Sequence, residues 1–277
     1  MILLSFDIEE FDMPFEYGRD ISFEEQMAVS KEGAQRILQL LEKQEVKATF
    51  YVTANFAQHA PEIVNRIIEG GHEVASHGYF HSNFKPEHLK ASKEVLEEIA
   101  KTRVEGYRMA RMMPVPETEI KKAGYIYNSS INPTFLPGRY NKLNEPRTYF
   151  LREGVWQLPA SVSPFFRFPL FWLSFHNLPA SLYRFLVKWT CKKDGYLNVY
   201  FHPWEFMPIG PKEKYNFPGY VTKNTDGKMT ERLEQFILWA KKRNYTFVRT
   251  KDFIHNIVLQ ISIPIANDAS TVCLQHY

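Results

Sequence analysis

The chain begins with MILLSFDIEEFD, residues 1–12, and this stretch decides how the remaining sequence is interpreted. Residues 2–6 are apolar apart from Ser5, which predicts a buried β-strand. Carboxylates that lie close together repel one another and favour a bound cation or a shared proton. Four of them follow this strand directly: Asp7, Glu9, Glu10 and Asp12. A solvated acidic loop is the ordinary alternative, so the cluster needs support from other parts of the chain.

Outward from this strand, short apolar runs alternate with helical patterns. Further strands are predicted at 48–52, 72–76, 106–108, 126–129, 196–201 and 246–249. Helices are predicted at 30–44, 61–70, 86–101, 116–123 and 230–243. Strands that alternate with helices imply a parallel sheet, either closed as a barrel or open and doubly wound. In both folds the functional residues lie at the carboxyl ends of the strands.

Two histidines, His77 and His81, follow the third predicted strand. Imidazoles four residues apart are a common way to hold zinc or a similar metal. In a chain with 9 histidines such a pair arises by chance in roughly one sequence in three or four. The position at a strand end therefore carries more weight than the spacing. Two histidines and a carboxylate would leave coordination positions open for water, as a catalytic metal requires.

Other polar residues end later strands in the same way. Arg108 ends one strand, Asn128 and Ser129 end the next, and His202 ends the strand LNVYF. Each has an ordinary alternative: a surface arginine, turn chemistry, or a histidine that caps its strand. The joint pattern is stronger, because an acid, a histidine pair, an arginine, a polar turn and a histidine end successive strands.

The length, composition and net charge indicate a globular protein with a sizeable hydrophobic core. It has 277 residues, 44% of them hydrophobic, and a formal net charge of +3, which is too small to indicate nucleic-acid binding. The sequence has no phosphate-binding glycine-rich loop and no nucleophile elbow of the G-x-S-x-G type. We expect a single domain over 1–256, with an aromatic-rich insertion at about 133–195 and an irregular tail over 257–277.

These residues, in this order, resemble the polysaccharide deacetylase family, or NodB-homology domain, from Ile2 to about Phe253. The first family motif, Thr-Phe-Asp-Asp-Gly, corresponds here to residues 5–10, SFDIEE, which is similar to a branch with an Asp-x-Glu motif. His77 and His81 meet the His-x-x-x-His motif, and Arg108 meets the arginine motif. The motif Tyr-x-Tyr-Asp-Ser-Ser corresponds to residues 125–130, and the final strand ending in histidine corresponds to His202 with Pro203, Trp204 and Glu205.

The resemblance implies a fold and an activity. The fold would be a distorted (β/α)7 barrel of the glycoside hydrolase and deacetylase type. The activity would be metal-dependent hydrolysis of N-acetyl groups on an amino sugar in a polysaccharide or a lipid-linked glycan. The resemblance implies a divalent metal, preferably zinc, with cobalt, nickel or manganese as alternatives, and an N-acetylated glycan as the substrate.

The resemblance also implies roles for single residues. Asp7 corresponds to the general base, Arg108 to the residue that holds the base, and His202 to the general acid. The metal ligands correspond to Glu9, His77 and His81. Substrate binding or support is implied for Asn128, Ser129 and Trp204.

The sequence departs from the family pattern at three positions. Glu9 replaces an aspartate, so Glu10 or Asp12 could supply the metal carboxylate instead. Asn128 stands where an acidic residue is common, which removes a charge that would raise the basicity of a catalytic histidine. Ala110 stands where proline is common. The alternatives are therefore a metal-independent amidohydrolase that acts on a small amide, or a carbohydrate-binding relative without turnover.

The stretch 163–190, SPFFRFPLFWLSFHNLPASLYRFLVKWT, is rich in aromatic residues, and all of its charges are positive. It is interpreted either as a buried insertion over the barrel or as a surface that contacts a membrane interface through residues such as Phe171 and Trp172. The two cysteines and the absence of a signal-peptide pattern favour a cytoplasmic protein, with peripheral contact at the inner membrane face as the alternative.

Overall fold

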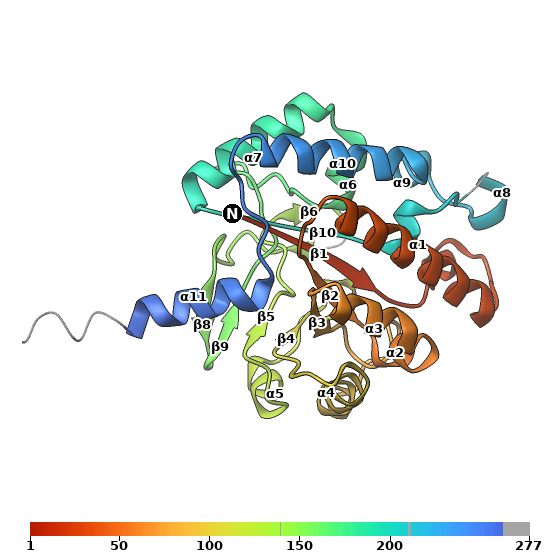
Figure 1. The fold of residues 1–277 in the computed structure, drawn as a ribbon, viewed down its shortest axis with the longest axis horizontal. Coiled ribbons are helices and arrows are strands. Elements are labelled where there is room, and N and C mark those ends of the chain that lie inside the picture. Colours follow the sequence, from red (N-terminus) through yellow and green to blue (C-terminus); the bar gives the residue numbers. More distant parts are fainter. Residues whose placement is uncertain (139, 210–211, 263–277) are drawn as a thin grey trace, which may run out of the picture.

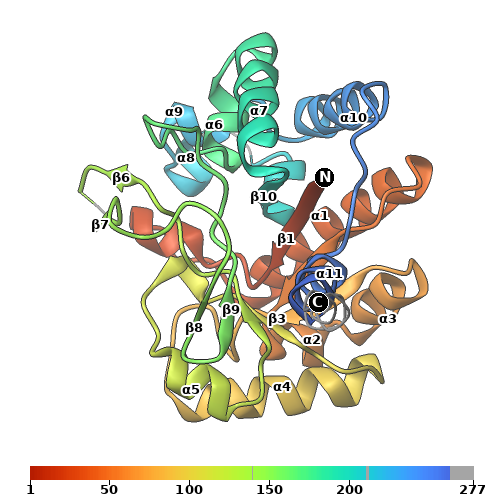
Figure 2. The same ribbon diagram turned by 90° about the vertical axis from the view of Figure 1, so that its left-hand side faces the viewer.

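A computed structural model describes residues 1–138, 140–209 and 212–262. A curled β-sheet lies at the centre of this part of the chain, and helices surround its outer side (Figure 1 and Figure 2). The helices α7 (Ala180–Asp194) and α10 (Gly227–Lys241) lie on the opposite side of the sheet from α4 (Glu87–Ala100) and α5 (Glu117–Lys122). None of the helices in the described part of the chain has both the length and the apolarity needed to cross a bilayer.

The central sheet has eight strands in the order β10-β1-β2-β3-β4-β5-β9-β8. The seven strands from β10 to β9 pair in parallel, and β8 pairs antiparallel with β9. The bounds are β1 Ile2–Ile8, β2 Thr49–Val52, β3 Glu73–Ser76, β4 Gly106–Tyr107, β5 Tyr127–Asn128, β8 Phe150–Arg152, β9 Val155–Gln157 and β10 Leu197–Phe201. The predicted (β/α)7 barrel with seven parallel strands is confirmed, in a form whose sheet is curled and open between β10 and β8.

A short contact bridges part of this opening. Ser161, four residues beyond β9, donates its main-chain N–H to the carbonyl oxygen of Asn198 in β10 at 2.9 Å. The hydroxyl of Ser161 accepts the N–H of Asn198 at 2.8 Å. The chain that follows the seventh parallel strand is thereby joined to the first strand of the sheet.

The apolar character of β1 follows from its place in the barrel. All seven of its residues are buried, because one face lies inside the barrel and the other lies under helices. A polar residue in such a strand requires a specific partner, which is the case for Asp7 described below.

The structure contains more helices than the apolar patterns predict, and α1 is longer than predicted. α1 begins at Phe23, because the hydroxyl of Ser22 accepts the N–H of Glu25 at 3.2 Å, and it ends at Lys43. The predicted start at residue 30 was wrong, since the first turns carry few apolar residues. The other helices are α2 Ala54–His59, α3 Pro61–Glu69, α6 Trp172–Asn177, α8 Lys212–Tyr215, α9 Gly219–Thr222 and α11 Thr250–Ser262, with 3-10 helices η1 Met13–Tyr17, η2 Ala110–Met112 and η3 Pro203–Phe206.

Two predictions for secondary structure in the second half of the chain were wrong. Thr230 does not cap α10, which begins at Gly227, and its hydroxyl bonds back to the carbonyl oxygen of Asp226. Residues 246–249 form only an isolated bridge between Ile2 and Phe247, and α11 begins directly after them at residue 250.

The predicted tail begins too early, and the predicted insertion is not continuous. Residues 257–262 extend α11, where Ile254 and Ile257 are buried, and residues 263–277 lie outside the described part of the chain. Within the predicted insertion, β9 belongs to the central sheet. The rest of that stretch contains the small hairpin β6 (Phe135–Leu136) and β7 (Tyr140–Asn141), the edge strand β8, and the helices α6 and α7.

Candidate active site

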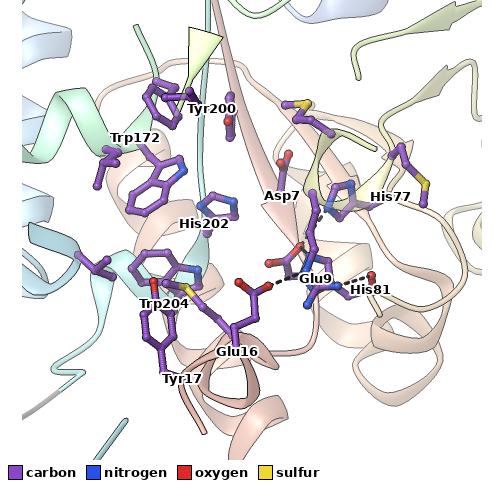
Figure 3. A pocket seen from close by; sticks show the side chains of 18 of the residues that line it. Asp7, Glu9, Glu16, Tyr17, His77, His81, Trp172, Tyr200, His202 and Trp204 are labelled. Carbon is purple, nitrogen blue, oxygen red and sulfur yellow. Dashed lines mark hydrogen bonds and ion pairs between the residues drawn. The ribbon is translucent and has the colours of Figure 1, made fainter. Parts of the chain in front are cut away.

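A cavity of about 370 Å³ opens at the carboxyl ends of the strands. Its walls come from the ends of β1, β3 and β10 and from the loops that follow them (Figure 3). The titratable side chains Asp7, Glu9, His77 and His81 line one side, and His202 lies across from them. The lining also includes six aromatic residues: Tyr17, Phe171, Trp172, Tyr200, Trp204 and Tyr220.

Three of the predicted site residues bring ligand atoms together. Oε2 of Glu9 lies 3.0 Å from Nε2 of His77 and 2.9 Å from Nε2 of His81. The three atoms lie within 4.8 Å of one another, and the side chains are almost completely buried. One carboxylate oxygen and two imidazole nitrogens thus face a common point, as in catalytic sites that keep further positions open for water.

The outer nitrogens of both rings are fixed by hydrogen bonds. Nδ1 of His77 lies 2.9 Å from the carbonyl oxygen of Arg108, which can only accept, so Nδ1 carries the proton. Nδ1 of His81 lies 2.6 Å from Oδ1 of Asp12. A neutral ring at either position therefore directs the lone pair of Nε2 into the space that the two rings share with Glu9, where a metal would lie.

The other two carboxylates of the first loop have different partners. Glu10 accepts the hydroxyl proton of Thr53 at 2.8 Å and a second bond from the amide of Asn55, so it ties the loop to the start of α2. Asp12 contacts His81, and it also accepts the hydroxyl proton of Ser82. Of the three candidates that the sequence leaves open, Glu9 is the one that joins the two histidines.

Charge and burial oppose each other in this cluster. Burial raises the pKa of the Glu9 carboxyl, but His81 and His77 outweigh it and hold that pKa well below its ordinary value. Burial lowers the pKa of His81, whereas Glu9 and Asp12 raise it to about 10. In the absence of a metal the imidazolium proton therefore stabilises the two carboxylates, and a divalent cation would take its place. The donor set of two imidazoles and one carboxylate fits zinc, cobalt, nickel or manganese.

Asp7 forms a buried ion pair with Arg108. Nη1 of Arg108 donates to Oδ1 of Asp7 at 2.5 Å, and the two residues are 0% and 3% exposed. Arg108 also donates to the hydroxyl of Ser5 at 3.0 Å, and to the carbonyl oxygen of Ser129 at 3.2 Å and its hydroxyl at 3.0 Å. Its guanidinium lies 3.9 Å from the centre of the Tyr51 ring. The predicted contact between the arginine and the carboxylate is present.

His202 is held by a second buried carboxylate. Oε1 of Glu205 accepts from Nδ1 of His202 at 2.8 Å and from its main-chain N–H at 2.7 Å. Oε2 of Glu205 contacts Nε2 of His176 at 2.7 Å, and Nδ1 of His176 lies 2.7 Å from the carbonyl oxygen of Lys223. Burial lowers the pKa of His202, but the hydrogen bond that its ring donates to Glu205 and the charges of nearby carboxylates outweigh burial and raise that pKa. This favours the protonated form of His202.

The three residues predicted to bind substrate or support the site lie in different positions relative to the cavity. Asn128 donates to Oε1 of Gln157 at 2.9 Å and accepts from Ser130, and it does not line the cavity. Ser129 holds Arg108, as described above. Trp204 lines the cavity and stacks on His202, with ring centres 5.5 Å apart and an angle of 18° between the rings.

Two residues of the site were not predicted from the sequence, and the position of a third was left open. Glu205 was quoted only as part of the motif around His202, although a carboxylate three residues beyond a histidine can reach its ring. His176 gave no signal, because it lies in a different helix. Trp172, for which the sequence left a buried and a membrane-facing position open, lines the cavity, and its ring centre lies 5.7 Å from that of His202.

Comparison with known proteins agrees with this geometry. Residues 13–111 match the family model for polysaccharide deacetylase. The peptidoglycan-N-acetylmuramic acid deacetylase PdaA of Bacillus subtilis is 26% identical over 74 residues, which are 27% of this chain and 27% of that protein. The chain spans only 17–27% of the lengths of the curated relatives that it matches.

Solved structures share the fold over most of the chain. A protein of Mycobacterium smegmatis assigned to the polysaccharide deacetylases is 19% identical, with a TM-score of 0.61 over 94% of this chain and 90% of that one. The allantoinase Puue is 14% identical, with a TM-score of 0.60 over 91% of this chain and 87% of that one. Residues 13–111 thus match a polysaccharide deacetylase domain, and the solved structures show that the rest of the chain shares the fold of these proteins. The matched segment includes His77, His81 and Arg108, whereas Asp7, Glu9 and His202 lie outside it and are placed by the fold.

Proposed function

We propose that the chain is a metal-dependent hydrolase that removes N-acetyl groups from an amino sugar in a polysaccharide or a lipid-linked glycan. One observation carries the proposal. A cluster of ligand atoms from Glu9, His77 and His81 lies in the same cavity as a carboxylate, Asp7, and faces a histidine, His202, across it (Figure 3).

The side chains around the cavity supply the remaining parts of an amide hydrolysis. A divalent ion held by the cluster would polarise the acetyl carbonyl and lower the pKa of a water molecule bound to it. Asp7 accepts the proton of the attacking water, and Arg108 keeps this carboxylate oriented. His202, kept protonated by Glu205, gives its proton to the sugar nitrogen as the C–N bond breaks. Acetate and a free amine are the products.

The lining of the cavity suits a sugar. Trp172 and Trp204 lie next to His202, with ring centres 5.2 Å apart at an angle of 82°. Such rings offer flat apolar surfaces, and the charged groups on the opposite side offer hydrogen bonds. A bound sugar would therefore have its acetyl group near the cluster and its nitrogen near His202.

Acetate release from a panel of N-acetylated glycans and lipid-linked amino sugars tests the proposal. Because peptidoglycan N-acetylmuramic acid is named in the relative PdaA, that glycan belongs in the panel. We expect release from at least one substrate, its loss with a chelator, and its recovery when zinc, cobalt, nickel or manganese is added. Turnover that a chelator does not affect would contradict the metal dependence.

The fold is also compatible with an alternative function, hydrolysis of a small amide, because the allantoinase Puue has a similar architecture. Allantoin and simple acetamides therefore belong in the same assay. Hydrolysis of these compounds without release of acetate from any glycan would favour this alternative function. The absence of turnover on every substrate, in protein loaded with metal, would favour a carbohydrate-binding relative.

A further inference from the structure

The two most exposed large apolar side chains in the described part of the chain are neighbours in sequence. Phe165 is 81% exposed and Phe166 is 84% exposed. Both lie at the tip of a turn closed by two main-chain bonds, from Ser163 N to Phe168 O at 2.8 Å and from Arg167 N to Ser163 O at 3.1 Å. The tip presents two aromatic rings to solvent on a short, hydrogen-bonded support.

The backbone of this turn is unusual for the residues that it contains. Phe165 has a φ of 62° and Arg167 a φ of 52°, a region that bulky residues rarely adopt. Conformations of this kind persist where the surrounding structure enforces them, and they often have a function. The fold therefore holds Phe165 outward at a conformational cost, although glycine would adopt the same backbone freely.

The turn continues into an apolar strip on α7. The ring of Trp189 lies 6.0 Å from that of Phe165 and 6.5 Å from that of Phe185. Phe185 is 58% exposed, and Leu182, one helical turn earlier, is 43% exposed. We call these five residues the aromatic patch: Phe165, Phe166, Leu182, Phe185 and Trp189. Isolated apolar residues are normal on a protein surface, but a contiguous group of this kind indicates a binding surface.

The charges within the segment that carries the aromatic patch have one sign. No aspartate or glutamate occurs between residues 154 and 193, while Arg167, Arg184, Lys188, Lys192 and Lys193 lie in this stretch. Lys188, Lys192 and Lys193 are exposed on α7, the helix that carries most of the aromatic patch. Aromatic side chains combined with lysines favour the interface of a bilayer with anionic headgroups, where the rings enter the headgroup region and the lysines meet negative charge.

The structure corrects the residues that the sequence assigned to such a surface. Phe171 is 7% exposed and Trp172 lines the cavity, so neither can reach a membrane. The exposed positions are instead those of the turn and the outer side of α7. We propose that the aromatic patch is a peripheral docking site for a lipid bilayer that carries anionic headgroups. This inference rests on the patch and its charges, and it does not depend on the proposed function.

Co-sedimentation with vesicles tests the proposal. The probes are vesicles of phosphatidylcholine alone and vesicles of phosphatidylcholine mixed with phosphatidylglycerol. We expect binding to the mixed vesicles at low salt, weaker binding at high salt, and a blue shift of the Trp189 emission that is absent in Trp189→Phe. The double variant Phe165→Ser and Phe166→Ser should lower the partition coefficient by at least about tenfold, because two exposed phenyl groups no longer enter the interface.

Three further double variants separate the role of the aromatic patch from the general effects of removing exposed rings or reversing charges. Phe15→Ser with Phe23→Ser removes two phenyl groups that are 45% and 37% exposed in η1 and α1, and it should leave vesicle binding unchanged. Lys188→Glu with Lys192→Glu should weaken binding to the mixed vesicles. Lys90→Glu with Lys122→Glu, on α4 and α5 on the opposite side of the molecule, should not (Figure 1).

Three outcomes would overturn the proposal, provided that thermal melting shows the variants to be folded. The first is no binding to mixed vesicles at low salt. The second is equal binding to both kinds of vesicle. The third is a concentration-dependent dimer that the phenylalanine variants abolish while vesicles remain unbound, which would assign the patch to a second copy of the chain.

Discussion

Each titratable residue of the candidate site has a buried partner of opposite charge or a buried hydrogen-bond partner. Asp7 is paired with Arg108, and His202 with Glu205. In such pairs the removal of one member leaves the other buried without compensation, so stability and chemistry change together. Single substitutions therefore do not separate the two effects, and matched variants are needed.

The three carboxylates of the first loop should differ sharply in metal binding. Glu9→Gln should abolish binding of zinc, because it removes the oxygen that joins the two histidines. Asp12→Asn should weaken binding by about 10- to 100-fold, since it loosens the orientation of His81. Glu10→Gln should leave the affinity unchanged, because its partners are Thr53 and Asn55. Titration calorimetry with zinc measures all three, and loss of binding in Glu10→Gln would refute this assignment.

The ion pair of Asp7 and Arg108 gives Asp7→Asn two effects. Turnover should fall by about 100-fold or more, because a general base is lost. With Arg108 at 0% exposure, the variant should also be less stable by about 3–5 kcal/mol, because a buried charge loses its partner.

A double variant separates these effects. Asp7→Asn combined with Arg108→Gln should recover part of the lost stability in urea unfolding while turnover stays low. Near-normal kcat in Asp7→Asn alone would show that Asp7 is not the base.

Glu205 should set the basic limb of the pH profile. Its carboxylate raises the pKa of His202, and a general acid acts only below its pKa, so activity falls as the pH rises past that value. Glu205→Gln should lower the pKa of His202 and move the basic limb of kcat/KM to lower pH. Asn128→Asp is the matched control, because Asn128 contacts Gln157 and Ser130 rather than His202. A shift in Asn128→Asp with none in Glu205→Gln would reverse the assignment.

At the scale of elements, the position of His202 depends on the contact between α1 and η3. Gly33 lies in the middle of α1, and a Cβ atom there would lie 2.1 Å from the carbonyl oxygen of Pro203. Gly33→Ala must therefore displace η3, which holds Glu205 and directly follows His202. We expect a loss of about 1–3 kcal/mol in stability, as for other overpacked sites, together with a loss of turnover.

The control for this variant is Gly227→Ala. Gly227 begins α10, and a Cβ atom there would have no neighbour within 4 Å, so stability should stay the same or rise slightly. Equal thermal melting temperatures for Gly33→Ala and the unchanged protein would show that the two elements do not pack as described.

The elements also show what the sequence can reveal. The ends of β1, β3, β4 and β10 were predictable, because buried strands are apolar throughout and a polar residue at their ends stands out. Two other features were not predictable: the contact of His81 with Asp12, and the hydrogen bonds that link His202, Glu205 and His176. Both depend on how loops and helices pack against the sheet. The structure of the stretch 133–190 could not be predicted either. Its aromatic residues lie in the core, in the cavity and on the surface, and no periodic pattern in the sequence distinguishes these positions.

At the scale of the whole molecule, the site exists only when the barrel is formed. Glu9 follows β1, His77 follows β3, and the pair lies 68 residues apart in sequence. The unfolded chain cannot hold these atoms together, so a metal that binds the folded state adds to stability by mass action. At about a hundredfold excess over Kd the gain is about 2.7 kcal/mol, which corresponds to an increase in Tm of about 5–10 °C for a chain of this size.

The effect of a chelator on Tm should depend on pH in a defined direction. Without metal, His81 has a pKa of about 10 in the folded state, against 6.5 as its ordinary value. Its proton therefore stabilises the metal-free protein fully below pH 6.5, and this contribution is lost as the pH rises toward 10. A bound metal replaces that proton and also binds more tightly as the proton leaves. The difference in Tm between loaded and chelated protein should thus widen from about pH 6 to about pH 9. Differential scanning calorimetry measures it, with His81→Ala as the control that should show almost no difference at any pH. A difference that stays constant or narrows over this range would mean that the metal does not compete with the proton on His81.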